Sequence, residues 1–327
     1  MLQSVDLQVN GYAGVDFNSD DLSSDELHRA CQRLATDGVA GILATIITDT
    51  IERMTARLSR LVLLRAADPL ATKLILGIHI EGPFISSEPG YVGAHPAAAT
   101  RPACLDKMEQ LLDAAAGLTR IVTLAPERDR QCLVINTLAK RGVCVSAGHC
   151  NPDLEQLDAA IDAGLSMFTH LGNGCPLQMN RHDNVVQRVL SRSRWLWISF
   201  IADGVHIPWP ALRNYITLVG CDRTIIVTDA ISAAAMPPGA FKVGEQSVVV
   251  DKNGATWSKD RSHLVGSSST MPQVKANLGR ILELPDDDIE LLTAANPMRA
   301  IGISEGLTGS LIPNSIQGRP FAKCEDV

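Results

Sequence analysis

Short apolar runs alternate with amphipathic stretches along most of the chain. The runs are rich in β-branched residues and lack strict polar alternation, which is typical of strands covered on both faces. We expect eight strands, at residues 5–10, 41–46, 74–80, 119–124, 143–147, 166–169, 197–202 and 224–228. Helical periodicity is clear between several of them, at residues 24–36, 51–66, 130–141 and 154–163.

This alternation predicts an α/β fold, a (β/α)8 barrel of the TIM type, because helical crossovers keep successive strands parallel. An open doubly wound sheet is the alternative. That fold would be expected to carry a G-x-G-x-x-G loop after its first strand, whereas residues 10–14 read N-G-Y-A-G. The barrel is therefore favoured.

The pattern changes after Asp229. Residues 241–250 and 255–257 predict a short β-hairpin insertion after the eighth strand, with its turn at 251–254. Two helices are expected near 271–282 and 286–295. We assign residues 1–305 to the barrel domain and residues 306–327, which are rich in Gly, Pro, Ser and Asn, to an irregular C-terminal tail.

Composition narrows the class of protein. The net charge of −7 argues against nucleic-acid binding, which requires a basic face. No apolar stretch reaches the ~20 residues that span a bilayer, and the chain does not start with a basic segment followed by an apolar run. The eight cysteines form no C-x-x-C pair, which favours reduced thiols. We expect a cytoplasmic protein that binds neither nucleic acid nor membrane.

Ionisable residues follow five of the predicted strands. They are Glu81, His149, His170, His206 and Asp229. The carboxyl ends of barrel strands form the mouth at which barrel enzymes place their chemistry. A single histidine after a strand is more often structural, but five such residues on one rim are costly to bury unless they are paired or bind a metal. The pattern therefore predicts a functional site at this mouth.

Two imidazoles and a carboxylate, from His149, His170 and Glu81, suit a catalytic Zn²⁺ that keeps one position for water. Such an ion lowers the pKa of bound water from 15.7 toward ~7. Asp229 is the candidate general base, and an N-cap for the next segment is its alternative role.

A serine or cysteine nucleophile is the other hydrolytic device. No G-x-S-x-G elbow occurs in the sequence. Cys150 and Cys175 flank the predicted site, but small packing residues explain them better. The G-S-S-S-T run at 266–270 fits either an oxyanion cradle or a plain polar loop.

A set of motifs extends this interpretation from residue 6 to residue 302. They are D-L-Q-V-N-G-Y-A-G-V-D-F-N (6–18), G-I-H-I-E-G-P-F (77–84), G-A-H-P (93–96), V-T-L-A-P-E (122–127), V-S-A-G-H (145–149), T-H-L (169–171), I-A-D-G-V-H (201–206), V-T-D-A (227–230), G-S-S-S-T-M (266–271) and N-P-M-R-A-I-G (296–302). In this order they resemble the N-acetylglucosamine-6-phosphate deacetylases of the amidohydrolase superfamily.

The resemblance implies that Glu81, His149 and His170 hold the metal and that Asp229 is the general base and acid. It implies that His95 polarises the acetyl carbonyl, and that Arg181 and His206 bind the phosphate, for which an arginine fork is well shaped. The substrate-contacting positions that it implies are Ala94, His95, Asn173, Gly174, Arg181, Asp203, Gly204, Val205, His206, Leu264, Val265 and Gly266.

The resemblance also bears on the metal. Many amidohydrolases carry H-x-H at the end of the first strand, where it binds a second ion. Here the residues are Gln8 and Asn10, whose neutral amides are weak zinc ligands. We therefore expect one divalent ion, with Zn²⁺ favoured and Fe²⁺, Co²⁺ or Mn²⁺ as alternatives.

Three departures from the family pattern are present. The family's L-Y-N-A-M is replaced by L-G-N-G-C at 171–175, and the stretch 180–184 is unusually polar. The chain starts directly at the first barrel strand, so the family's flanking β-sandwich is expected to be missing or rudimentary. A homodimer partner is expected, and it is a candidate to cover the barrel face that this domain would have covered.

We expect hydrolysis of the N-acetyl group of N-acetylglucosamine 6-phosphate, which gives glucosamine 6-phosphate and acetate. The first alternative is another acylated amino sugar, such as N-acetylgalactosamine 6-phosphate, or a cyclic amide. The second is a non-catalytic barrel that binds a sugar phosphate.

Overall fold

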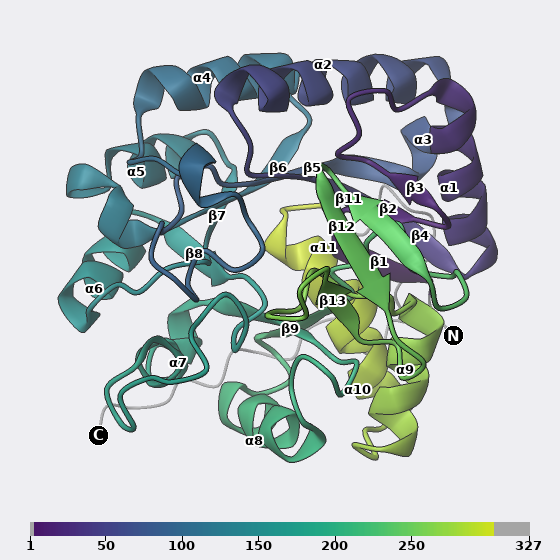
Figure 1. Ribbon diagram of the computed structural model, residues 1–327. Helices are drawn as coiled ribbons and strands as arrows, with labels where there is room; N and C mark the ends of the chain where they lie inside the picture. The colour runs from purple at the N-terminus through teal and green to yellow at the C-terminus, as the bar shows by residue number, and fades with distance from the viewer. Residues whose placement is uncertain (1–2, 304–327) are drawn as a thin grey trace.

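Eight parallel strands form the centre of the molecule, in the order β1-β4-β5-β6-β7-β8-β9-β10 (Figure 1). The computed structural model describes residues 3–303, so the predicted tail at 306–327 lies outside the described residues. The strands are β1 (Ser4–Val9), β4 (Val39–Ile47), β5 (Ile75–Glu81), β6 (Thr119–Leu124), β7 (Cys144–Ala147), β8 (Leu165–Phe168), β9 (Trp197–Ile201) and β10 (Thr224–Val227). The predicted TIM-type barrel is confirmed.

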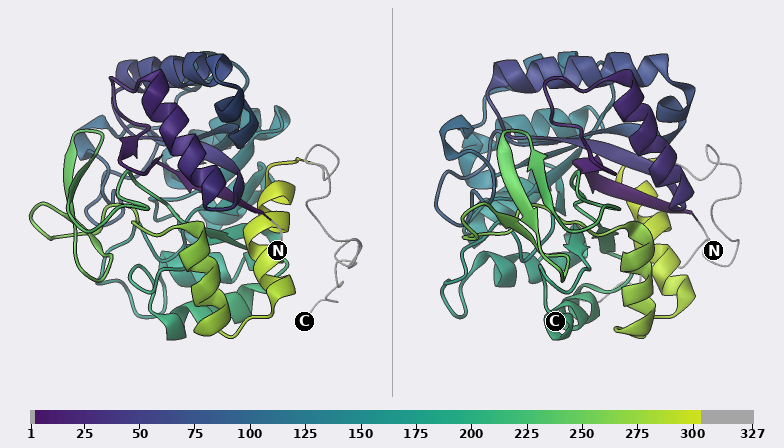
Figure 2. Two further views of the ribbon diagram at one scale, coloured as in Figure 1. Left: turned by 90° about the vertical axis from the view of Figure 1, so that its right-hand side faces the viewer. Right: turned by 45° about the vertical axis from the view of Figure 1, so that its right-hand side comes forward.

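Helices follow the strands and surround them, as Figure 2 shows from two further sides. The α-helices are α1 (Ser24–Thr36), α2 (Ile51–Ala67), α3 (Pro69–Leu74), α4 (Leu105–Ala114), α5 (Leu133–Lys140), α6 (Leu154–Asp162), α7 (Val185–Leu190), α8 (Trp209–Val219), α9 (Met271–Arg280), α10 (Asp286–Glu290) and α11 (Asn296–Ala300). Single turns of other helix types are η1 (Ala97–Ala99), η2 (Pro126–Arg128), η3 (Arg130–Cys132), η4 (Ser193–Trp195) and the π-turn η5 (Leu291–Ala295). No helix within residues 3–303 is long and apolar enough to cross a membrane.

Helix α1 shows how the sequence fixes these elements. Ser23 and Glu26 form a reciprocal capping box at its start, which satisfies two otherwise unpaired backbone donors. Leu27, Cys31 and Leu34 are buried on one side of the helix, at the spacing that brings side chains onto one face. The amphipathic pattern thus predicts both the helix and the face that packs against the barrel.

The seam between β1 and β10 closes mainly beyond the ends of these strands. Asn10 N and Gly11 N donate to the carbonyl oxygen of Ala230 at 2.7 and 3.2 Å. Within the barrel, the buried Asp6 carboxylate accepts a 2.5 Å hydrogen bond from the Thr228 hydroxyl. Burial raises the pKa of Asp6 to about 7, although the hydrogen bond from Thr228 opposes this shift. The seam therefore brings the residue after β1 next to the segment that carries Asp229.

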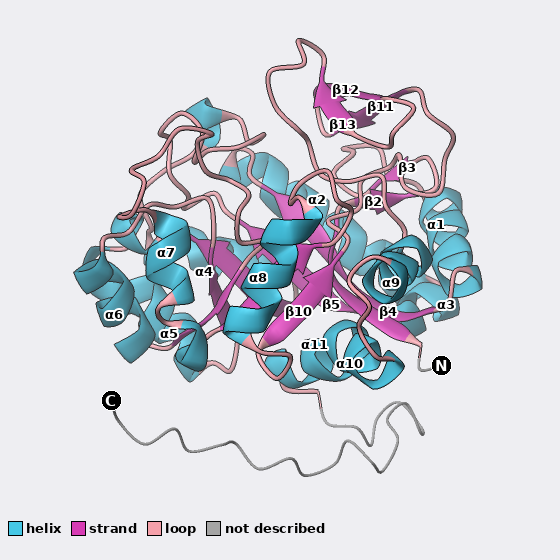
Figure 3. Cartoon of the chain, turned by 90° about the horizontal axis from the view of Figure 1, so that it is seen from below, coloured by secondary structure: helices cyan, strands magenta, loops and turns pink. Residues whose placement is uncertain are grey.

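Two apolar layers hold the barrel together. The larger one lies between the strands and the surrounding helices, and the smaller one fills the amino-terminal end of the barrel. In the smaller layer, Met298 of α11 and Ile301 pack against Val5, Leu43 and Ile225 of the strands. Figure 3 shows α10 and α11 at one end of the barrel and the sheet β11-β12-β13 at the other. The carboxyl ends of the strands are thus left free for polar side chains.

The segment after β10 is a three-stranded antiparallel sheet of β11 (Ala240–Val243), β12 (Gln246–Val250) and β13 (Thr256–Ser258). The predicted hairpin corresponds to β12 and β13. The predicted first strand, 241–250, is itself folded back into two strands. Val243 pairs with Gln246 across a two-residue turn that begins with Gly244 at φ +54, a conformation that tight hairpin turns require and that glycine readily adopts.

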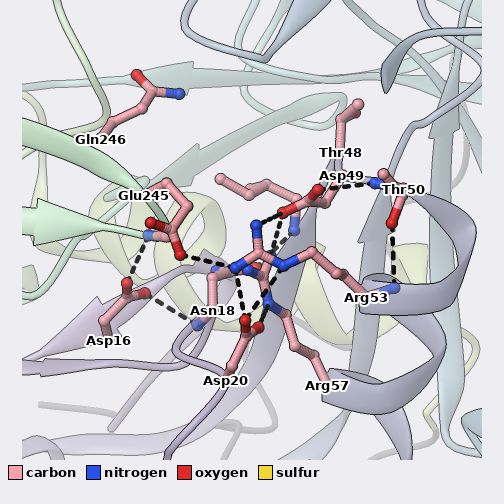
Figure 4. A network of polar contacts seen from close by, with 12 residues as sticks. Asp16, Asn18, Asp20, Thr48, Asp49, Thr50, Arg53, Arg57, Glu245 and Gln246 are labelled. Carbon is pink, nitrogen blue, oxygen red and sulfur yellow. Dashed lines mark hydrogen bonds and ion pairs between the residues drawn. The ribbon is translucent and has the colours of Figure 1, made fainter. Parts of the chain in front are cut away.

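A polar network joins this sheet to the barrel (Figure 4). Gly244 N donates to Asp16 Oδ2 at 2.6 Å. Arg53 of α2 donates to Glu245 Oε1 at 2.7 Å and to Asp20 Oδ2 at 2.5 Å. The turn between β11 and β12 is therefore tied both to Asp16 of β3 (Val15–Asp16), which pairs with β2 (Gly11–Tyr12), and to the first turn of α2.

Two helix boundaries differ from expectation for local reasons. The predicted helix at 130–141 forms only as α5, because Gln131 and Cys132 take left-handed backbone at φ +56 and +51. The predicted helix at 286–295 consists of α10 and the π-turn η5, and it continues into α11.

Candidate active site

The predicted site residues converge at the carboxyl ends of the strands. Glu81 is the last residue of β5, whereas His149, His170 and Asp229 each lie two residues beyond a strand. These three residues all take left-handed backbone, at φ +51, +35 and +51. Non-glycine residues in this conformation cost of order 1–3 kcal/mol each and cluster at functional sites.

The buried Glu81 carboxylate lies at the centre. Its Oε1 is 3.0 Å from His170 Nε2 and 3.3 Å from His149 Nε2. Gln8 Nε2 donates to both carboxylate oxygens at 3.2 Å. Burial favours the neutral acid, but hydrogen bonds from His149 and His170 outweigh it and hold the pKa of Glu81 well below its usual range. A buried anion of this kind requires positive charge beside it.

The donor set fits a divalent metal ion. His149 Nδ1 lies 3.0 Å from the Tyr91 carbonyl oxygen, which can only accept, so Nδ1 carries a proton. When the ring is neutral, as a metal ligand must be, its Nε2 presents a lone pair to the ion. Within residues 3–303, potential ligand atoms of Glu81, His95 and His149 lie within 4.8 Å of one another. His170 contacts the same Glu81 oxygen. Nitrogen and carboxylate donors of this type suit Zn²⁺ and related ions.

Asp229 is held beside this cluster. Asn10 Nδ2 donates to its Oδ1 at 2.7 Å, so Oδ2 is the oxygen left to act on a ligand. Burial raises the pKa of Asp229 to about 6, while the positive field of His170 and the hydrogen bond from Asn10 oppose the shift. A carboxylate with this pKa is suited to accept a proton and later return it near neutral pH.

Close glycine contacts fix the His149 ring. A Cβ atom on Gly174 would lie 2.8 Å from His149 Nδ1, and one on Gly93 would lie 2.8 Å from His149 Cε1. Real Cβ atoms essentially never approach other atoms so closely. Gly93 and Gly174 therefore confine the imidazole, which the Tyr91 carbonyl also orients.

The site opens into a cavity of about 600 Å³. Of the residues predicted to contact substrate, those that line the cavity are Ala94, His95, Asn173, Gly174, Val205, His206, Leu264, Val265 and Gly266. Asp203 and Gly204 are not among the lining residues. Asp203 instead accepts a 2.6 Å hydrogen bond from His206 Nδ1, which leaves His206 Nε2 for a ligand.

Arg181 is exposed and is not among the residues that line the cavity. It lies in the loop between β8 and α7, which includes the polar stretch 180–184. Its predicted contact with a phosphate group stays a prediction.

The small sheet supplies a wall of the cavity that the sequence did not reveal. The lining residues of this segment that we did not predict are Val243, Gln246, Trp257, Ser262 and His263. The Gln246 side-chain amide donates to the carbonyl oxygen of Ala94. Trp257 Nε1 donates to Asp251 Oδ2 at 3.1 Å. The sequence predicted strands here but did not indicate which face of the sheet lines the mouth of the barrel.

Comparisons with known proteins agree with this site. No protein-family model matches the chain. N-acetylgalactosamine-6-phosphate deacetylase from Escherichia coli O157:H7 is 30% identical over 311 residues, which cover 94% of this chain and 79% of the relative. N-acetylglucosamine-6-phosphate deacetylase from Bacillus subtilis is 31% identical over 301 residues, which cover 91% and 74%.

A solved structure supports the same assignment. It is a variant of N-acetyl-D-glucosamine-6-phosphate deacetylase from Mycobacterium smegmatis in complex with N-acetyl-D-glucosamine-6-phosphate. It superposes with a TM-score of 0.83 at 31% identity and covers 92% of this chain and 77% of the solved chain. The barrel, the site and these comparisons define an enzyme, a hydrolase of the amidohydrolase type. The chain belongs to the N-acetylglucosamine-6-phosphate deacetylase family.

The glycine contact with His149 gives a test of how the site is fixed. The Gly174→Ala substitution would displace the His149 ring. We therefore expect the affinity of the protein for Zn²⁺ to fall by about 10- to 100-fold, the range seen when a metal-binding histidine loses the group that orients it. Competition with a chelator measures this affinity.

Gly172→Ala is the matched control, because Gly172 lies in the same loop at positive φ, yet a Cβ there would approach no atom more closely than 3.6 Å. Equal losses in both variants would contradict the role of Gly174 and would point to backbone strain alone.

Proposed function

We propose that the protein hydrolyses the N-acetyl group of an amino-sugar 6-phosphate, with N-acetylglucosamine 6-phosphate as the first candidate. The products are glucosamine 6-phosphate and acetate. The observation that carries this proposal is the convergence of Glu81, His149 and His170 beside Asp229. The M. smegmatis enzyme in complex with N-acetyl-D-glucosamine-6-phosphate supports the choice of substrate.

Glu81, His149 and His170 would hold one divalent ion, with Zn²⁺ as the first candidate. When bound, such an ion polarises a carbonyl oxygen and acidifies water at neutral pH. Asp229 takes a proton from the attacking water through Oδ2 while Asn10 holds its other oxygen. As the amide C–N bond breaks, Asp229 returns this proton to the nitrogen, so that acetate and a free amine leave.

The cavity carries groups suited to the rest of the substrate. His206 lines it and is oriented by Asp203, so its Nε2 is available to a phosphate oxygen. Asn173 and the backbone around Gly266 line the same space and offer neutral donors and acceptors for sugar hydroxyls. Arg181 remains a proposed phosphate contact that would require the loop at 180–184 to reach the substrate.

N-acetylgalactosamine 6-phosphate is the second candidate substrate, because the E. coli relative bears that name at similar identity and coverage. Gly172 lines the cavity at the position where the family pattern has a tyrosine. The family resemblance therefore does not decide which sugar epimer this cavity accepts. A homodimer and a cytoplasmic location also stay predictions from the sequence.

Acetate release from a matched set of substrates tests the proposal. We expect N-acetylglucosamine 6-phosphate to be hydrolysed with the higher kcat/KM, its 4-epimer more slowly, and unphosphorylated N-acetylglucosamine at least 100-fold less well, because a buried site built for a charged group discriminates strongly against its absence. Equal rates with and without the phosphate would contradict the proposed substrate class.

The role of Asp229 is tested separately. Asp229→Asn keeps the shape of the side chain but removes the proton acceptor, so kcat should fall by about 10²- to 10⁴-fold while the metal content stays unchanged. Full turnover in this variant would refute the assignment. Loss of the metal together with activity would instead make Asp229 a ligand.

A further inference from the structure

His95 lies closer to the candidate metal ligands than a purely substrate-binding role requires. It follows β5 in the loop before η1. Its Nε2 is 3.2 Å from His149 Nε2, and the two rings meet edge to face with centroids 4.3 Å apart. His95 Nδ1 is buried and has no hydrogen-bond partner in the part of the chain that the structure describes.

This contact conflicts with metal binding by His149 unless His95 changes its role. Because His149 Nδ1 donates to the Tyr91 carbonyl, Nε2 is the lone-pair nitrogen of the neutral ring. That lone pair can accept an N–H from His95 or bind an ion, but not both. If His149 binds the ion, two ring nitrogens 3.2 Å apart require a cation near both or the withdrawal of one ring.

The spacing of the donor atoms favours a shared cation. Donors at about 2.0–2.1 Å from one tetrahedral ion lie roughly 3.3 Å from each other. The separations here are 3.2 Å for His95–His149, 3.3 Å for His149–Glu81 and 3.0 Å for His170–Glu81. The potential ligand atoms of Glu81, His95 and His149 all lie within 4.8 Å of one another, whereas His170 joins this group through its contact with Glu81. His95 therefore approaches the cluster as closely as the predicted ligands do.

We propose that His95 is an additional, exchangeable ligand of the divalent ion in the substrate-free protein, alongside Glu81, His149 and His170. This inference rests on the metal use in the proposed function but not on the identity of the sugar. Catalytic metal sites keep one position for water or substrate. His95 occupies that position at rest and gives it up when the acetyl carbonyl enters.

The loop around His95 provides a means for this exchange. Residues 87–90 are exposed, and Gly90 and Gly93 both take positive φ. The Ala94 carbonyl next to His95 is held by the Gln246 side chain of the small sheet. This contact anchors the backbone at His95, so the proposed exchange requires rotation about the side-chain torsions of His95.

X-ray absorption at the zinc edge of the full chain, loaded with one equivalent of Zn²⁺, counts the imidazole ligands directly. We expect three in the wild type and two in His95→Gln. Chelator competition should show that this variant binds zinc about 10-fold more weakly or worse. Removing a group that only orients a ligand already weakens metal binding by about this factor. His263→Gln is the matched control, because it removes an exposed imidazole from the same cavity and should leave three imidazoles and full affinity.

The exchange itself is tested in the Asp229→Asn variant. Addition of N-acetylglucosamine 6-phosphate should lower the count from three imidazoles to two. A count that stays at three with substrate bound would contradict exchange. Two imidazoles in the substrate-free wild type, with unchanged zinc affinity in His95→Gln, would overturn the ligand role.

These failures are distinct from failure of the proposed function. A wild-type protein that binds zinc through two imidazoles and releases acetate would remove only the inference about His95. A protein that binds no divalent ion would remove both.

Discussion

A carboxylate buried among imidazoles is the constraint on which the rest of the site depends. Glu81 has almost no access to water, and Gln8 offers it only neutral donors. Its negative charge therefore has to be met by His149 and His170 or by a cation that they share. The barrel supplies this arrangement because parallel strands end together at one mouth, so residues nearly ninety positions apart come into contact.

The backbone at the mouth is shaped for the same purpose. His149, His170 and Asp229 each leave their strand in left-handed conformation, which turns the side chain inward instead of letting the strand continue. Small residues make this possible, since Gly93 and Gly174 lie against His149 where any side chain would collide with the ring. The sheet β11-β12-β13, tied to α2 through Arg53 and Glu245, closes one side of the cavity.

The sequence predicts what depends on local pattern. Strand β6 occupies the expected residues 119–124 because a buried strand needs a short run of apolar and β-branched residues, and that run is visible. The positions of Glu81, His149 and Asp229 could be predicted in the same way, because a polar residue directly after a buried parallel strand lies at the mouth of the barrel. The family resemblance added roles that pattern alone would not have given.

What the sequence could not show depends on how loops fold over the mouth. The loop after β5 was expected to place His95 against a substrate, yet its ring meets His149, a contact fixed by the path of the loop and not by spacing. Arg181 is exposed, as the polar residues around it suggest, and its expected contact with a phosphate stays a prediction. Trp257 and His263 line the cavity only because the inserted sheet folds back over the barrel.

Metal reconstitution tests the central claim most directly. Protein stripped of metal should release no acetate from N-acetylglucosamine 6-phosphate. Activity should return in proportion to added Zn²⁺ and reach its maximum at about one ion per chain, because one cluster around Glu81 holds it. Stripped protein with undiminished activity, or protein that stays inactive with Zn²⁺, Fe²⁺, Co²⁺ and Mn²⁺ alike, would contradict this account.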